Sequence, residues 1–236
     1  MSDQQPQEEP FQTYMLVVAH PDDAEFSSAG TIAKLAKEGK KVILIQVTSG
    51  DMGTADPSVS PIDLAIRREA EECKAAKILG IDEVVFLRVT DGTVVSDMNM
   101  REKVVRMIRT YKPDVILTHD PFRPYALHPD HRAVGMATTD AVYPTARDPH
   151  YFPAHGRAGL EPHKTAEIWY FGAETPDLFI DITDTFDTKI AALREHESQV
   201  GKAEGLEERL RERAQELAKD QPFELAEAFK VVKMRR

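Results

Sequence analysis

The chain has 236 residues, a length that suits one large α/β domain. Its 42% hydrophobic and 30% charged residues are typical of a globular protein and exclude a disordered chain. The net charge of −10 makes binding to the phosphate backbone of a nucleic acid unfavourable, so no nucleic-acid partner is expected.

Short apolar runs alternate with amphipathic segments along most of the chain. Residues 1–13 are rich in Gln, Glu and Pro, and we expect a flexible tail there ahead of a single domain over 14–236. Apolar or β-branched runs predict strands, and a 3.6-residue periodicity predicts the helices between them. The strands are expected at 14–19, 41–48, 83–87 and 114–118, and the helices at 27–37, 63–79, 97–111 and 129–143.

This alternation predicts an α/β fold of the Rossmann-like, doubly wound type, with a mostly parallel sheet and helices on both faces. Beyond residue 143 the pattern weakens. The segment Pro144–Lys164 is rich in proline and histidine, which predicts a mobile loop over the cleft rather than a second metal site. Two further strands are expected at 167–171 and 178–182, and residues 185–217 are expected to be mostly helical.

Two polar clusters follow the first and the fourth predicted strands. His20–Asp23, with the sequence HPDD, comes directly after the first strand. His128–His131, with the sequence HPDH, comes one loop after the fourth. In the common doubly wound order these two strands are neighbours where the winding reverses, and a crevice opens at their carboxyl ends. We therefore expect the clusters to face each other across one cleft.

The residue types in these clusters point to a metal site. Two imidazoles and a carboxylate with a fourth position left open are the ligand set of a catalytic zinc site, which lowers the pKa of a bound water to about 7. A second carboxylate must then take the proton, and Asp22, next to Asp23, is the candidate. Either cluster alone is more often a capped helix start, and the same ligands can hold iron(II). A metal-free binding domain and an iron(II) enzyme therefore remain alternatives to a zinc hydrolase.

At these residues the sequence resembles the LmbE-like family of metal-dependent de-N-acetylases, relatives of the N-acetylglucosaminyl-phosphatidylinositol de-N-acetylase. The leading family motif, Ala-His-Pro-Asp-Asp, stands here as Ala19–Asp23, and the second, His-Pro-Asp-His, as His128–His131. The resemblance runs from residue 15 to about residue 143, with looser support to about residue 197. It implies removal of an acetyl group from N-acetylglucosamine or a glucosamine conjugate.

The resemblance also implies the metal and its ligands. His20, Asp23 and His131 match the zinc ligands of the family, and Asp22 matches the general base. One zinc ion per chain is expected, although iron(II) or another divalent metal can occupy such a site.

Four further residues receive roles from the resemblance. His128 matches the residue that stabilises the oxyanion or protonates the leaving amine, and Asp130 matches a carboxylate that fixes the tautomer of a histidine. Arg68 and Asp91 match residues that contact the sugar substrate. Members of the family form oligomers, so a homo-oligomer is expected.

Other features of the sequence indicate the compartment of the cell in which we expect the protein, the cytoplasm. The longest apolar runs, such as 15–19 and 42–45, are far shorter than the roughly 20 residues of a membrane span. Residues 1–10 lack the basic start and apolar core of a secretory signal. Cys73 is the one cysteine, which fits a reducing cytoplasm, and it is expected to be packed on the apolar face of helix 63–79.

Overall fold

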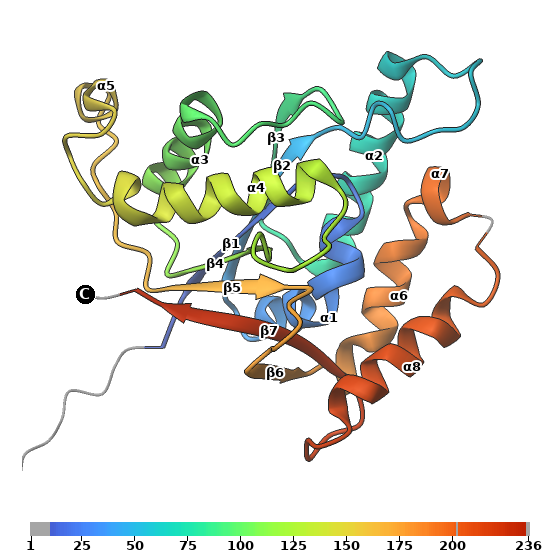
Figure 1. The fold of residues 1–236 in the computed structure, drawn as a ribbon. Helices are drawn as coiled ribbons and strands as arrows, with labels where there is room; N and C mark the ends of the chain where they lie inside the picture. Colours follow the sequence, from blue (N-terminus) through green and yellow to red (C-terminus); the bar gives the residue numbers. More distant parts are fainter. Residues whose placement is uncertain (1–9, 202, 235–236) are drawn as a thin grey trace, which may run out of the picture.

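The computed structural model describes residues 10–201 and 203–234 and shows one sheet between two layers of helices (Figure 1). The strands are β1 (Thr13–Val18), β2 (Lys41–Thr48), β3 (Glu83–Val89), β4 (Val115–His119), β5 (Glu167–Phe171), β6 (Leu178–Asp181) and β7 (Ala226–Lys233). The helices are α1 (Asp23–Lys37), α2 (Pro61–Leu79), α3 (Met98–Tyr111), α4 (Pro129–Asp140), α5 (Pro153–Arg157), α6 (Phe186–Arg194), α7 (Glu197–Val200) and α8 (Leu206–Ala218), with a π-helical turn η1 (Ala141–Ala146) and a 3₁₀ turn η2 (Thr183–Thr185).

The sheet has the predicted doubly wound topology. Its order is β3-β2-β1-β4-β5-β7-β6, and β1 to β5 run parallel while β7 is antiparallel to both β5 and β6. The strands β1 and β4 are therefore neighbours at the reversal of the winding, as predicted. The strand β1 takes in Thr13, the last residue of the expected tail, and residues 1–9 of that tail lie outside the described residues.

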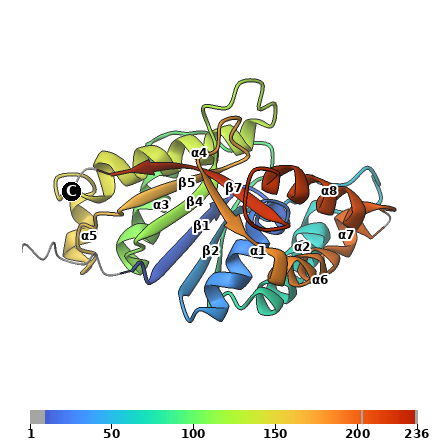
Figure 2. The ribbon, with the colours of Figure 1, turned by 90° about the horizontal axis from the view of Figure 1, so that it is seen from below.

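Alternate residues of the central strands pack against helices on opposite faces. Leu16 and Leu44 belong to a core cluster with residues of α1 and α2, whereas Val17 and Ile45 belong to a cluster with residues of α3 and α4. Figure 2 shows the sheet between these two helical layers. Burial on both faces explains why these strands are continuous apolar runs. None of the helices within 10–201 and 203–234 is long and apolar enough to cross a membrane.

Helix α2 buries a more polar face than its periodicity predicts. Cys73, expected to be packed, is exposed, so that expectation is wrong. The buried residues of α2 include Arg68, Glu71 and Glu72 as well as Leu79. The hydrophobic pattern predicts that polar residues face solvent. Because α2 turns three charged side chains toward the protein interior, its orientation differs from the predicted one.

The segment Pro144–Lys164 does not cover the cleft, in contrast to the expectation. Three backbone carbonyl oxygens of this segment accept hydrogen bonds from Nη2 of the Arg109 guanidinium in α3. His163 Nε2 lies 2.8 Å from the carbonyl oxygen of Pro113, which precedes β4. The segment is thus fixed at the amino ends of the strands, and Figure 1 shows α5 at this end of the sheet.

The strand β7 was not predicted from the sequence. Its charged residues Glu227, Lys230 and Lys233 interrupt the apolar run that identifies a buried strand. The strand pairs on one side with β5 and on the other with the short strand β6. The antiparallel β7 therefore extends the parallel sheet toward α8.

Gly135 tests how closely α4 must approach the sheet. A Cβ atom at this position would lie 2.5 Å from the carbonyl oxygen of His119. We predict that Gly135→Ala lowers the free energy of unfolding by about 1–3 kcal/mol in urea denaturation, because α4 must move. Gly156→Ala is the matched control, since nothing lies within 4 Å of a Cβ there. Equal stability of both variants and the wild type would contradict this packing.

Candidate metal centre and active site

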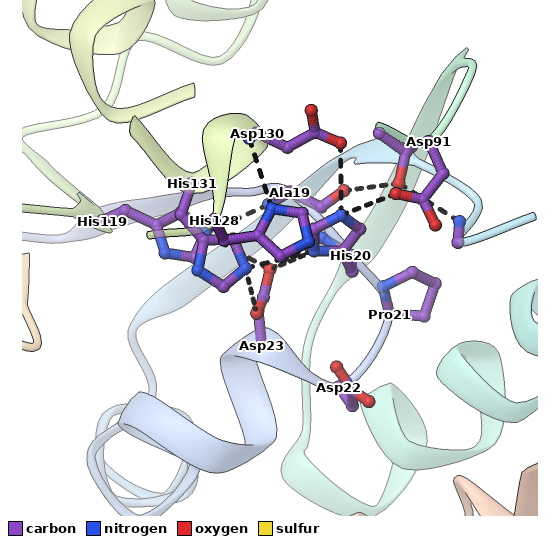
Figure 3. A network of polar contacts seen from close by, with 12 residues as sticks. Ala19, His20, Pro21, Asp22, Asp23, Asp91, His119, His128, Asp130 and His131 are labelled. Atoms are coloured by element: carbon purple, nitrogen blue, oxygen red, sulfur yellow. Dashed lines mark hydrogen bonds and ion pairs between the residues drawn. The ribbon is translucent and has the colours of Figure 1, made fainter. Parts of the chain in front are cut away.

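The two motifs meet at the carboxyl ends of β1 and β4. These strands pair in parallel, so both end at the same edge of the sheet. His20 lies in the loop between β1 and α1, and Asp23 begins α1. His128 caps the N-terminus of α4, whose first turn contains His131. Figure 3 shows these side chains converging on one centre.

The three expected metal ligands present their donor atoms to one another. His20 Nδ1 lies 3.1 Å from His131 Nε2 and 3.5 Å from Asp23 Oδ2. His131 Nε2 lies 3.2 Å from Asp23 Oδ1. A tetrahedral site with bonds of about 2.0–2.1 Å separates its ligand atoms by about 3.3 Å. The donor types and their spacing therefore fit a small divalent cation.

His119 is a further candidate ligand that the sequence analysis did not assign. It is buried at the end of β4, where its Nε2 accepts the Ala19 N–H at 3.2 Å and lies 3.3 Å from Asp23 Oδ2. Its ring stacks on that of His131, with 4.2 Å between the ring centroids. Asp23, His119 and His131 also form a group that could hold a metal ion. The sequence does contain one signal for His119 as a residue of the site, which is its position at the end of the fourth predicted strand.

Two carboxylates hold the other ring nitrogen of His20. Its Nε2 lies 3.0 Å from Asp91 Oδ1 and 3.3 Å from Asp130 Oδ2. Such carboxylates fix the proton on Nε2 and leave Nδ1 free to bind a metal. Asp91 also accepts the Met52 N–H at 3.3 Å, and Asp130 accepts the Gly92 N–H at 2.7 Å. Asp91, expected to contact the sugar, therefore lies behind His20 together with Asp130.

The charges at this centre favour a cation. Burial lowers the pKa of His20, but hydrogen bonds and charges of Asp23 and Asp91 raise it to about 10. Burial raises the pKa of Asp23, yet the charge of His119 and hydrogen bonds from three histidines hold that pKa well below its usual range. Surroundings that stabilise a protonated imidazole this strongly also stabilise a metal ion.

Asp22 lies apart from the histidine rings, beside α2 (Figure 3). Its backbone has φ of 100°, in the left-handed region that residues other than glycine rarely adopt. Its Oδ2 accepts a hydrogen bond from Arg68 Nη2 at 3.3 Å. Burial, followed by the charge of Asp23, raises the pKa of Asp22 to about 7 even though Arg68 lowers it. A carboxyl group with a pKa near neutrality can act as a general base.

Arg68 is directed at the backbone of the loops that follow β1 and β2. It is buried, and its Nη1 donates to the Gly50 carbonyl oxygen at 3.1 Å. Its Nη2 donates to the Pro21 carbonyl oxygen at 2.5 Å as well as to Asp22. The guanidinium that was expected to contact the sugar therefore fixes the loops around Asp22 in this structure.

His128 is exposed at the edge of the centre. Its Nδ1 accepts the Asp130 N–H at 3.3 Å, so a neutral ring carries its proton on Nε2. Burial, followed by the charges of His20 and His131, lowers the pKa of His128. The neutral form is thus favoured, and His128 can donate a hydrogen bond to a ligand in the cleft.

A cavity of about 250 Å³ opens onto this centre. It reaches from Asp23, His119 and His131 to the wall formed by β7 and α8. Its lining combines apolar side chains such as Phe171 with charged ones such as Arg213. This mixture suits a small polar ligand with some apolar surface.

The chain is similar to a known protein family and to several characterised deacetylases. A family model described as GlcNAc-PI de-N-acetylase (PIG-L) matches residues 15–142. Diacetylchitobiose deacetylase of Thermococcus kodakarensis is 37% identical over 194 residues, which cover 81% of this chain and 72% of that protein. The 1D-myo-inositol 2-acetamido-2-deoxy-alpha-D-glucopyranoside deacetylase of Kineococcus radiotolerans is 27% identical over 251 residues, covering 79% and 68% respectively.

A solved structure is similar over nearly the whole chain. The N,N'-diacetylchitobiose deacetylase from Pyrococcus horikoshii, complexed with an inhibitor, has a TM-score of 0.89 and 30% sequence identity. The match covers 94% of this chain and 84% of the Pyrococcus chain. The likeness therefore extends well beyond residues 15–142, which the family model matches.

Metal content tests the assignment of the ligands. We predict that the purified protein binds about one divalent metal ion per chain and that His131→Ala loses it, because His131 belongs to two of the three groups of candidate ligands at this centre. His128→Ala should retain the metal. Elemental analysis by mass spectrometry measures both. Full metal content in His131→Ala would contradict the proposed centre.

Asp91→Asn distinguishes two roles for this side chain, support of the ligand His20 and contact with the sugar substrate. Since Asp91 lies behind His20, we predict that metal affinity falls about 10- to 100-fold in competition with a chelator, whereas KM at saturating metal stays near that of the wild type. An increase in KM with unchanged metal affinity would instead indicate a contact with the substrate.

Proposed function

The chain belongs to the GlcNAc-PI de-N-acetylase (PIG-L) family, and we propose that it is a zinc-dependent hydrolase that removes the acetyl group from an N-acetylglucosamine-type sugar. N,N'-diacetylchitobiose and N-acetylglucosaminyl conjugates of inositol are the first substrates to test, because the names of the relatives specify them. The reaction consumes one water and one amide and yields acetate and a free amine.

The observation that carries this proposal is the convergence of two distant motifs on one centre. His20 and His131 are 111 residues apart in sequence, yet their ring nitrogens lie 3.1 Å apart. Asp23 supplies a carboxylate between them. Zinc bound by these residues would lower the pKa of a water molecule and polarise the amide carbonyl.

Asp22 would take the proton of the attacking water. Its pKa of about 7 lets the carboxylate accept a proton at neutral pH and release it later in the reaction. The left-handed backbone at Asp22 lets consecutive carboxylates take different tasks, because Asp23 contacts the histidines while Asp22 contacts Arg68. After the attack, protonated Asp22 would return its proton to the leaving nitrogen.

His128 would stabilise the charge that develops on the carbonyl oxygen. Its Nδ1 accepts the Asp130 N–H, which leaves the Nε2–H available as a donor. A fixed donor aimed at developing negative charge stabilises the transition state more than the ground state. Asp130 would act indirectly, since it orients both His128 and His20.

Asp22→Asn tests the general base without altering the metal ligands. Asparagine tolerates the left-handed backbone and keeps the shape of the side chain but cannot accept the proton. We predict normal metal content and a loss of about 10²- to 10⁴-fold in kcat, measured as amine release from N-acetylated sugars.

Asp56→Asn in an exposed loop is the control for this substitution and should leave kcat unchanged. Full activity of Asp22→Asn would disprove the proposed base. Absence of amine release by the metal-loaded wild type, across the whole set of N-acetylated sugars, would contradict the proposed function itself.

A further inference from the structure

A second cluster of ionisable side chains is buried next to the active site. It consists of Glu25 in α1, Glu72 in α2 and His196 between α6 and α7, and none of the three is exposed. One polar atom of each lies within 4.8 Å of the others. His196 Nε2 is 3.4 Å from Glu25 Oε2. Such a cluster is costly to bury unless its charges compensate one another.

The charges of this cluster can balance internally. Burial, followed by the charge of Glu25, raises the pKa of Glu72 well above its usual range, which favours the neutral carboxyl group. Glu25 Oε2 and His196 Nε2 lie within the distance of an ion pair. A protonated Glu72 still offers a carbonyl oxygen as a hydrogen-bond acceptor.

Glu72 connects this cluster to the catalytic loop. Its Oε2 accepts the N–H of Asp22 at 3.3 Å. On the same helix, Arg68 donates to the carbonyl oxygen of Pro21, which precedes Asp22. Both sides of the Pro21–Asp22 peptide are therefore held by α2. A residue other than glycine keeps a left-handed backbone only where its surroundings hold it in this way.

Residues 196–199, at the start of α7, form hydrogen bonds that fix α2. Ser198 donates from its backbone N–H and its hydroxyl to Glu71, at 2.9 Å and 2.5 Å. Gln199 Nε2 donates to the Gly53 carbonyl oxygen at 3.1 Å, in the loop that follows β2. These bonds and the contact of His196 with Glu25 fasten residues 196–199 to α1, to α2 and to that loop.

We propose that Glu72, buried beside Glu25 and His196, is a positioning residue for the catalytic base and that it acts by fixing the backbone of Asp22. This inference rests on the proposed function, in which Asp22 takes a proton from water. Misplacement of a catalytic group by about 1 Å can reduce a rate about 100-fold. The acceptor oxygen of Glu72 is therefore expected to affect kcat rather than substrate binding.

Two substitutions of Glu72 distinguish the effect of its acceptor oxygen from the effect of the size of its side chain. Glu72→Leu removes the acceptor, and Glu72→Gln retains a neutral carbonyl oxygen. We expect Glu72→Leu to lower kcat about 10- to 100-fold with KM within about twofold and metal content unchanged. Glu72→Gln should restore most of the activity. Glu69→Leu is the matched control on the same helix, because that carboxylate contacts Arg88 and Ser49 instead; it should keep kcat within about twofold.

A second measurement does not require turnover. Amide hydrogen exchange of Asp22, followed by NMR with ¹⁵N-labelled aspartate, should be about tenfold faster in Glu72→Leu than in the wild type or Glu72→Gln. If the wild type releases no amine, the proposed function fails while the exchange data still decide the role of Glu72.

Three results would overturn the inference. They are unchanged kcat and Asp22 exchange in Glu72→Leu, an equal loss of activity in Glu72→Gln, and a second metal ion per chain that is lost from both variants. The last result would identify Glu25, Glu72 and His196 as metal ligands instead.

Discussion

The parallel pairing of β1 and β4 is the constraint on which the active site depends. Each strand ends in a histidine-containing segment, and the reversal of winding between them leaves that edge of the sheet open to solvent. The pairing brings His20 and His131 into contact although α1, α2 and α3 and the three strands β2, β3 and β4 separate them in sequence. Both strands are buried from Tyr14 and Val115 onward, so the core fixes the register that aligns the two motifs.

At this edge of the sheet, carboxylates lie next to histidine and arginine side chains, so their opposite charges stabilise one another. Asp23, Asp91 and Asp130 surround His20, and its pKa is raised to about 10 because the hydrogen bonds and charges of Asp23 and Asp91 outweigh burial. Neighbouring Asp22 is instead shifted toward neutrality, because burial and the charge of Asp23 outweigh the attraction of Arg68. In the proposed mechanism these adjacent carboxylates therefore have different tasks, Asp23 as a ligand of a cation and Asp22 as the acceptor of a proton.

The sequence predicted the elements whose signals are local. The strands β1 to β5, the adjacency of β1 and β4 and the meeting of the two motifs followed from apolar runs and from the switch-point rule. Side chains that are polar and buried could not be predicted from periodicity, which treats them as solvated. The orientation of α2 was wrong for this reason: Arg68 and Glu72 point inward, whereas Cys73 is exposed. The contacts of Asp91 and His196 likewise depend on segments that only the tertiary structure brings together.

Anomalous diffraction from crystals of the active, metal-loaded protein would locate the metal ion directly. We expect one anomalous peak per chain at about 2.0–2.2 Å from His20 Nδ1, from a carboxylate oxygen of Asp23 and from His131 Nε2. Strong deacetylase activity in crystals with no peak at this position, or with the peak at another set of residues, would contradict this expectation.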